Sequence, residues 1–198
     1  AAMREQPIDF ETLRYTPLEI ESSPVRCPSA QASRAMEEEI AAARAVGDTL
    51  GGEVAVAIHG VAPALGSYRG GGMMARLSKA AFSVNDVVSV SFGSACDVTR
   101  RRGSAAYDSA VLGAHGFAHA TNISGGIEGG LTTGASVVMR VGVAPSASLR
   151  APQKSIDLET LSDAESFSAA YSPCLVGGVA VAIEAEIAFA LASAYQER

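Results

Sequence analysis

The most informative segment of this 198-residue sequence reads Thr121-Asn122-Ile123-Ser124-Gly125-Gly126-Ile127-Glu128-Gly129-Gly130-Leu131-Thr132-Thr133-Gly134. Glycine lets a backbone adopt a positive φ and approach other groups closely, and Asn, Ser and Thr add hydrogen-bonding side chains. The pattern is typical either of a tight turn between packed layers or of a cradle of N–H groups around an anion or a flat ring. It is neither a GxGxxG fingerprint nor a P-loop. Both interpretations stay open from the residues alone, and the turn is the commoner use of paired glycines.

Regular secondary structure is predicted on both sides of this glycine-rich segment 121–134. Apolar residues at spacings of three and four, with Ser29 as the N-cap and Gly47 as the stop, predict a helix over 31–46. A strand is predicted over 53–60, covered on both faces because every residue from 54 to 58 is apolar. The other expected elements are helices over 73–82 and 173–196 and strands over 18–20, 84–92, 110–112 and 135–143.

The order of these elements predicts an α+β fold built in layers, because strands and helices do not alternate as they do in a parallel βαβ sheet. Four prolines within residues 1–28 predict an irregular lead-in segment. Residues 29–198 have the length of a single domain.

Composition excludes several classes of protein. With 48% hydrophobic and 18% charged residues the chain can bury a core, which excludes disorder. A formal net charge of −6 argues against a nucleic-acid partner. Three cysteines without CxxC spacing predict reduced thiols and a cytoplasmic protein. The apolar stretch 175–194 contains Glu184 and Glu186, which predicts a core helix and no membrane span.

Two further groups of polar residues are candidates for chemistry. His115 and His119 stand four residues apart, a spacing that zinc ligands use on a helix. Gly113 and Gly116 argue against a helix there and no third ligand is evident, so we expect no metal site. The three arginines at 100–102 are either an anion-binding group or a solvated loop.

The order of several motifs along the chain resembles the second, C-terminal half of the chorismate synthase family, with a likeness to actinobacterial members. The resemblance covers residues 22–196. The motifs that carry it are Ser23-Pro24-Val25-Arg26-Cys27-Pro28, Gly47-Asp48-Thr49-Leu50-Gly51-Gly52, Gly60-Val61-Ala62-Pro63-Ala64-Leu65-Gly66-Ser67, Arg102-Gly103-Ser104 with Asp108, Thr121-Asn122 with Gly125-Gly126-Ile127-Glu128-Gly129-Gly130, then Pro145, Ile156-Asp157, and Cys174 with Glu184.

The resemblance implies a fold, a reaction and a cofactor. The family's fold is a layered β-α-β sandwich, of which this chain has half the length. Its members eliminate phosphate from 5-enolpyruvylshikimate 3-phosphate in an anti-1,4 reaction with reduced FMN, in the shikimate pathway to aromatic amino acids. The resemblance implies catalytic positions at Tyr171 and Ser172, and substrate or cofactor contacts at Asn122, Ser124, Gly125, Gly126, Gly129, Gly130, Ser148, Arg101 and Arg102.

Departures from the family pattern change the expected chemistry. The family's first half, with its flavin-binding arginines and catalytic histidines, has no counterpart in this sequence. Ala144, Ala170 and Ser172 stand where the family has a lysine, an arginine and an aspartate. Charge-assisted hydrogen bonds from such cations offset the charge of phosphates, and an aspartate that becomes serine no longer titrates. We therefore expect the isolated chain to bind FMN weakly or not at all.

Two functions from different classes follow. The first is a chorismate-synthase-type lyase that works with a separately encoded first half, or a repurposed lyase or cyclisation catalyst that acts on a small ring compound. The second is a non-catalytic ligand-binding or scaffold protein that retains the fold. Both predict a small-molecule ligand, and a half-length piece of a layered fold is expected to be a homo-oligomer or a complex with a first-half protein.

The ligand pocket is expected where the glycine-rich segment 121–134 meets Ser148, Tyr171 and Ser172. Its lining would be hydroxyls, an amide and glycine N–H groups, which suits a neutral or mono-anionic ring compound better than a phosphate ester. Gly126→Val is then expected to abolish ligand binding while the fold survives.

Overall fold

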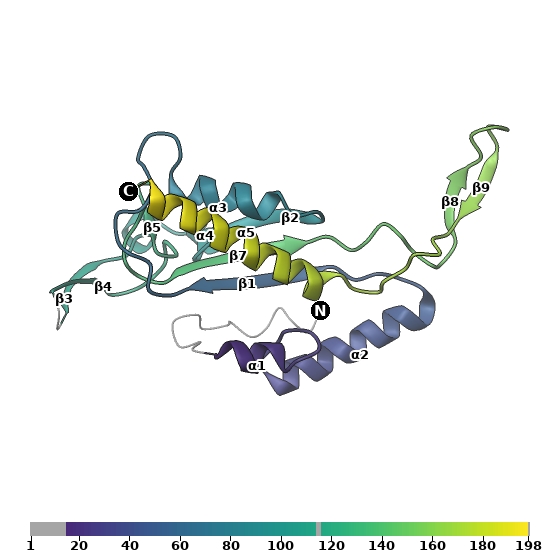
Figure 1. Ribbon diagram of the computed structural model, residues 1–198, viewed down its shortest axis with the longest axis horizontal. Coiled ribbons are helices and arrows are strands. Elements are labelled where there is room, and N and C mark those ends of the chain that lie inside the picture. The colour runs from purple at the N-terminus through teal and green to yellow at the C-terminus, as the bar shows by residue number, and fades with distance from the viewer. Residues whose placement is uncertain (1–14, 114–115, 198) are drawn as a thin grey trace.

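A computed structural model describes residues 15–113 and 116–197 of the protein. Its centre is an antiparallel sheet in the order β1-β7-β2, made by β1 (Gly52–Ile58), β7 (Val137–Val143) and β2 (Val87–Phe92), with a register shift between Val87 and Ser89. Two helices, α3 (Met73–Phe82) and α5 (Val176–Gln196), lie side by side across one face of this sheet (Figure 1). The predicted α+β class is confirmed.

The hydrophobic core lies between the sheet and these two helices. β7 forms its floor because five of the seven β7 residues are buried. β1 has one face in the core and the other exposed, so the prediction that it is covered on both faces is wrong for the described part of the chain. Two of the exposed positions of β1 are the alanines Ala55 and Ala57, which is why residues 54–58 read as apolar throughout. The largest core side chains are Leu65, Met73, Leu77, Ile127, Met139 and Ile183.

The helix α2 (Ala30–Val46) begins and ends where the sequence predicts. Ser29 is its N-cap and accepts a hydrogen bond from Ala32 N, and Gly47 ends it with a φ of 76°. The strand predicted over 18–20 is wrong, because these residues belong to the helix α1 (Pro17–Glu21). Thr16 and Glu19 form a capping box around its first turn, which overrides the local preference for a strand.

Two hairpins extend from opposite ends of the sheet (Figure 1). One is formed by β3 (Ala110–Gly113) and β4 (Gly116–His119), and the other by β8 (Gln153–Ile156) and β9 (Asp163–Ser166). All four β8 residues are exposed, so no apolar alternation marks this hairpin in the sequence. Short elements complete the fold, namely α4 (Ala95–Val98), the 3-10 turn η2 (Gly103–Ala105), β5 (Ile127–Glu128) and β6 (Leu131–Thr132).

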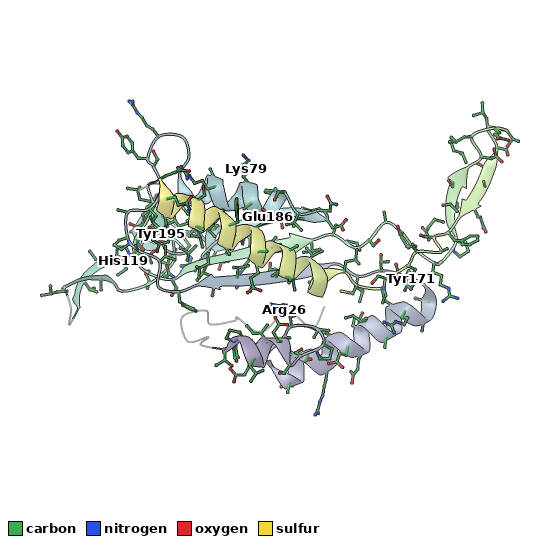
Figure 2. The ribbon with its side chains drawn as sticks, in the orientation of Figure 1. Arg26, Lys79, His119, Tyr171, Glu186 and Tyr195 are labelled. Carbon is green, nitrogen blue, oxygen red and sulfur yellow. The ribbon has the colours of Figure 1, made fainter. Side chains whose placement is uncertain are left out.

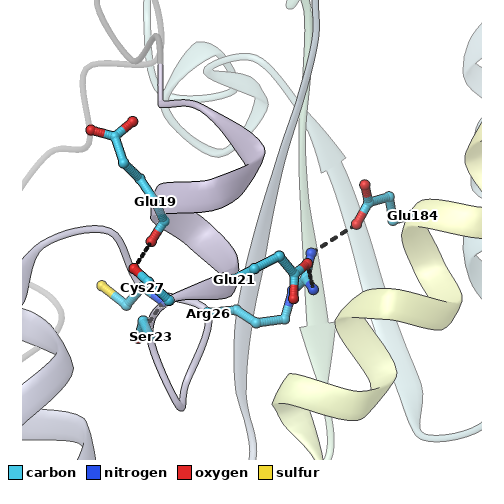
Figure 3. A network of polar contacts seen from close by, with 7 residues as sticks. Glu19, Glu21, Ser23, Arg26, Cys27 and Glu184 are labelled. Carbon is cyan, nitrogen blue, oxygen red and sulfur yellow. Dashed lines mark hydrogen bonds and ion pairs between the residues drawn. The ribbon is translucent and has the colours of Figure 1, made fainter.

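An ion-pair network joins the lead-in segment to α5. Arg26 has a φ of 56° and lies between α1 and α5 (Figure 2). Its guanidinium pairs with Glu21 of α1 and, at 2.8 Å, with Glu184 of α5 (Figure 3). Cys27 N donates a hydrogen bond to Ser23 Oγ (3.1 Å) and fixes the turn that presents Arg26.

The division of the chain into an irregular segment, residues 1–28, and a domain, residues 29–198, stays a prediction.

The helix α5 is long and apolar enough to cross a membrane by length and composition. In the fold, Ile183 and Ile187 are buried against the sheet and Glu184 is paired with Arg26. α5 is therefore packed against the sheet along one side and exposed along the other. The prediction of a core helix agrees with the packed side and not with the exposed side.

Shortening a buried side chain of α5 should destabilise the fold, whereas the same change on its exposed side should not. We expect Ile183→Ala to lower the free energy of unfolding by about 2–5 kcal/mol, because it leaves a cavity under the helix. Val181→Ala, on the exposed side of the same helix, should change it by less than about 0.5 kcal/mol. Urea unfolding followed by circular dichroism measures both, and equal losses would contradict this orientation of α5.

Candidate functional site

The glycine-rich segment 121–134 folds as a tight turn against the start of β7. Gly125 and Gly126 are buried, with φ values of 66° and 77°. A Cβ on Gly125 would lie 2.4 Å from Gly93 N, and one on Gly126 would lie 2.5 Å from Ser136 O. Val138 N donates a hydrogen bond to Gly125 O (3.2 Å). The first glycine pair thus serves close backbone packing, and Gly126→Val would disrupt the turn itself, which corrects the expectation that the fold survives.

The second glycine pair and its neighbours make a more open surface. Gly129, at a φ of 56°, has free space where a Cβ would be, whereas Gly130 packs closely on Ser67 O.

Asn122 Nδ2 donates to Ser136 O (2.9 Å), and Ser136 Oγ is 2.8 Å from His59 Nδ1. The amide of Asn122 therefore holds the turn to β7.

Asp108 fastens the glycine-rich segment to the preceding loop. Its carboxylate accepts hydrogen bonds from Thr121 Oγ1, from Ile123 N (2.7 Å) and from Ser124 N (2.8 Å). Burial alone would raise the pKa of Asp108, but these hydrogen bonds, with the Ser124 hydroxyl close by, outweigh it and lower the pKa. Ser124 Oγ is buried without a well-formed hydrogen bond. The hydrogen-bond partners of Asp108 follow it by 13–16 residues, so the sequence shows its spacing from the arginines and not its contacts.

His119 and Glu128 complete a polar group beside Asp108. The potential ligand atoms of these three residues lie within 4.8 Å of one another, and His119 Nδ1 is 3.8 Å from Glu128 Oε1. Both carboxylate oxygens of Asp108 already accept hydrogen bonds from the turn, so the chemistry of this donor set favours a structural role. His115, the other histidine of the i,i+4 pair, lies outside the described residues.

Tyr171 and Ser172 lie at the other end of the molecule. A shallow hollow of about 440 Å³ is lined by Arg150, Phe167, Ser168, Ala169 and Tyr171. Tyr171 Oη donates to Asp48 O (2.6 Å), and Ser172 Oγ donates to Cys174 O (3.2 Å). Ser148 is exposed two residues before Arg150. Arg150 is the cation of this hollow, and no motif in the sequence pointed to it.

The structure separates the two groups of predicted site residues. The glycine-rich segment bonds to the first residues of β7, whereas residues 144–150 follow its last residue. Seven strand residues span roughly 20 Å. Figure 2 shows Tyr171 and His119 at opposite ends of the molecule. The expected pocket between segment 121–134 and Ser148, Tyr171 and Ser172 is therefore not formed within the described chain.

The predicted arginines lie at the glycine-rich end. Ser94 N donates to Ile123 O (2.9 Å), which places the start of α4 against this turn. Arg101 is 3.9 Å from Asp97, and Arg102 is exposed at the start of η2. Both arginines lie on a solvated loop. A solvated loop was one of the two interpretations of the arginines at 100–102, and an anion-binding group was the other.

Neither end of the described chain fits FMN by itself. The hollow is shallow and its cation, Arg150, is exposed, while Ala170, between the lining residues Ala169 and Tyr171, carries no charge. At the other end, buried Gly125 and Gly126 press on backbone, and Arg101 and Arg102 lie on an exposed loop with Arg101 beside Asp97. A flavin phosphate needs several charge-assisted hydrogen bonds, and the lining of the hollow offers one cation.

An antiparallel sheet with two helices on one face and loops gathered at both strand ends is a layered α+β fold. The family model described as chorismate synthase matches residues 7–195, and the chain belongs to the chorismate synthase family.

Individual relatives agree with this assignment. The chorismate synthase of Exiguobacterium sibiricum is 37% identical over 180 residues, which are 90% of this chain and 47% of that protein. That of Rubrobacter xylanophilus is 38% identical over 178 residues, or 89% of this chain and 46% of that protein. A crystal structure of chorismate synthase, 24% identical, matches the fold with a TM-score of 0.76 over 100% of this chain and 53% of that chain. The chain spans about half the length of the curated relatives it matches.

The Asp108 carboxylate should stabilise the fold in a pH-dependent way. Because its pKa is lowered in the folded protein, its contribution is complete above the unfolded value of about 3.9 and is lost as the pH falls through the lower folded value. We expect Asp108→Asn to cost about 1–3 kcal/mol at pH 7 and the difference from the wild type to shrink at pH 3 and below.

Urea unfolding of both proteins at pH 7, 5, 3 and 2 measures this difference. The matched control is Asp97→Asn, an exposed aspartate at the same end of the molecule, which should cost less than about 0.5 kcal/mol at every pH. A penalty for Asp108→Asn that stays constant down to pH 2 would show that the carboxylate is not the stabilising group.

Proposed function

We propose that this chain is one half of a chorismate-synthase-type lyase, which acts on 5-enolpyruvylshikimate 3-phosphate together with a polypeptide that supplies the other half of the family's length. The observation that carries the proposal is the match of the whole chain to one half of a chorismate synthase fold. In this proposal FMN and the phosphate of the substrate are held mainly by the other half, in a cytoplasmic assembly.

The role of this chain's own residues follows from their contacts. The hydroxyl of Tyr171 is occupied by Asp48 O and that of Ser172 by Cys174 O, so both are positioned as structural donors. Arg150, exposed at the hollow, is the group free to contact an anionic ring compound. The chain thus supplies the scaffold and one cation, and the proton-transferring groups belong to the other half.

The same hydroxyl contacts favour a second candidate function, in which the chain is a non-catalytic ligand-binding or scaffold protein. A group that already donates its proton to a backbone carbonyl is not available as a general acid without breaking that hydrogen bond. In this alternative the hollow beside Arg150 would bind a carboxylic acid that carries a ring and would leave it unchanged. A repurposed lyase would bind its substrate in the same hollow and convert it.

Reconstitution distinguishes these functions. The purified chain is mixed with the part of the Exiguobacterium sibiricum chorismate synthase that it does not cover, together with reduced FMN and 5-enolpyruvylshikimate 3-phosphate, and chorismate is followed by absorbance. We expect chorismate from the mixture and none from either part alone. A mixture that forms a complex and makes no chorismate would favour the non-catalytic function.

The isolated chain should not retain a flavin. We expect no quenching of FMN fluorescence by the chain at concentrations up to about 100 μM, because Arg150 is the one cation among the residues that line the hollow. Arg150→Ala should behave like the wild type in this titration. A yellow protein that carries FMN in a one-to-one ratio would contradict both the expectation and its reason.

A conservative change at Tyr171 separates a structural from a catalytic hydroxyl. Tyr171→Phe should lower the free energy of unfolding by about 1 kcal/mol, the value of the hydrogen bond to Asp48 O, and should slow chorismate formation by the reconstituted pair less than threefold. The matched control is Tyr68→Phe, whose ring is 80% exposed and which should change neither quantity. A hundredfold loss of rate with unchanged stability would instead make Tyr171 a catalytic residue.

A further inference from the structure

Three side chains that can ligate a metal ion meet beside the glycine-rich segment 121–134. Asp108 lies in the loop before β3, His119 is the last residue of β4, and Glu128 is the last residue of β5. Their potential ligand atoms lie within 4.8 Å of one another. His119 lies at the end of the molecule opposite Tyr171 (Figure 2). The fold thus gathers one imidazole and two carboxylates from three separate segments of the chain.

The carboxylate of Asp108 is held in place and still has a site for an ion. Its Oδ1 accepts hydrogen bonds from Thr121 Oγ1 and Ile123 N, whereas its Oδ2 accepts one from Ser124 N (2.8 Å). An ionised carboxylate offers about four acceptor sites, so these hydrogen bonds leave one site on Oδ2. The turn therefore orients the carboxylate without using up its capacity to ligate a metal.

His119 and Glu128 are spaced for a shared ion. Nδ1 of His119 is 3.8 Å from Oε1 of Glu128, which is too long for a hydrogen bond. Ligand atoms that each lie roughly 2.0–2.2 Å from a zinc ion are at most about 4.4 Å apart, so this separation admits one ion between them. The His119 side chain is 12% exposed and that of Glu128 is 45% exposed. Burial thus fixes the imidazole, and the exposed glutamate is free to rotate toward Asp108.

A buried hydroxyl beside Asp108 is a second, independent sign of a bound group. Within residues 15–113 and 116–197, Ser124 Oγ is the one buried side-chain polar atom that lacks a hydrogen-bond partner. It lies close enough to the Asp108 carboxylate to help lower the pKa of that group. Buried polar atoms are nearly always paired, and an exception calls for an explanation such as a water or an ion. An ion held by Asp108, or the water bound to that ion, would supply the partner.

Charge and donor type select the kind of ion. Asp108 and Glu128 bring two negative charges into one partly buried group, where like charges repel each other and a divalent cation offsets both. Oxygen ligands alone suit magnesium and calcium, whereas an imidazole beside carboxylates suits zinc and its neighbours among the transition metals. The donor set therefore favours a transition-metal ion.

We propose that Asp108, His119 and Glu128 bind one divalent transition-metal ion, and zinc is the ion that we assign to the site. Three protein ligands leave a fourth position for water. The ion would extend the structural role of this polar group, because it links β4 and β5 to the loop that precedes β3. The inference goes beyond the proposed function and does not rest on it.

The sequence expectation of no metal site considered His119 together with His115, and a third ligand was lacking. In the fold the partners of His119 are Asp108 and Glu128, which stand on either side of it in the sequence. Neither lies at a spacing that a metal-binding motif uses, so contacts between loops were needed to find them.

Calorimetry on the metal-stripped full chain tests the site. We expect zinc chloride to bind one to one with a micromolar Kd, weaker than at a closed site of four protein ligands, and magnesium chloride at the same concentrations to release no heat. Zinc should also raise the melting temperature by several degrees, because the ion binds the folded chain. Glu128→Gln and His119→Ala should each raise the Kd for zinc at least about tenfold. Circular dichroism checks that both variants are folded.

The matched controls are His59→Ala and Glu159→Gln. His59 is an exposed histidine at the start of β7, where it contacts Ser136 Oγ. Glu159 is exposed in the distant turn between β8 and β9. Neither change should alter the Kd for zinc measurably.

X-ray absorption by the zinc-loaded chain separates this site from the thiols. Nitrogen and oxygen ligands lie roughly 2.0–2.2 Å from zinc, whereas a thiolate lies about 2.3 Å away. We expect no sulfur ligand, so the exposed thiol of Cys96 on α4 takes no part. A sulfur ligand on the bound ion would overturn the proposal. So would a Kd that His119→Ala and His59→Ala raise equally, or a chain that releases no heat with zinc.

Discussion

The pairing of β7 with both of its neighbours is the constraint on which the rest of the structure depends. β1 and β2 do not bond to each other, so each is held in the sheet by β7 alone. The buried side of β7 is also the floor of the core under α3 and α5. The first residues of β7 form hydrogen bonds with the glycine-rich turn, and its last residue is followed by the loop that contains Ser148 and Arg150. One strand therefore positions both groups of polar residues and keeps them apart.

The elements that sequence reasoning predicted are those whose burial leaves a periodic pattern. The helix α3 agrees with its predicted range, and α2 has the predicted cap and stop, because local capping and one-sided burial decide both. The hairpin β8–β9 lacks any buried face, and α1 is set by a capping box, not by periodicity. Neither could be read from apolar spacing.

The polar residues were harder to place than the elements. The glycine-rich segment 121–134 was singled out from the sequence, but a tight turn and an anion cradle require the same residue types. Only the backbone positions show that its first glycine pair packs tightly, as a turn does. Tyr171 was expected beside it because the family resemblance groups these positions. In this chain a whole strand lies between them, and spacing along a sequence carries no information on that distance. Arg150 and the group of Asp108 with His119 depend on contacts between loops, which single-sequence patterns do not encode.

The register of the sheet has a consequence for synthesis of the chain on the ribosome. β7 pairs with residues that were made long before it, Met139 with Phe92 and Val143 with Gly52. Contacts of such long sequence separation close slowly, because the loop entropy is lost before the strands stabilise each other. Two apolar strands therefore wait unpaired in the nascent chain until residue 143 has left the exit tunnel. Their partner β7 begins only at Val137, well after β2 has ended at Phe92, which makes this a protein whose sheet folds late.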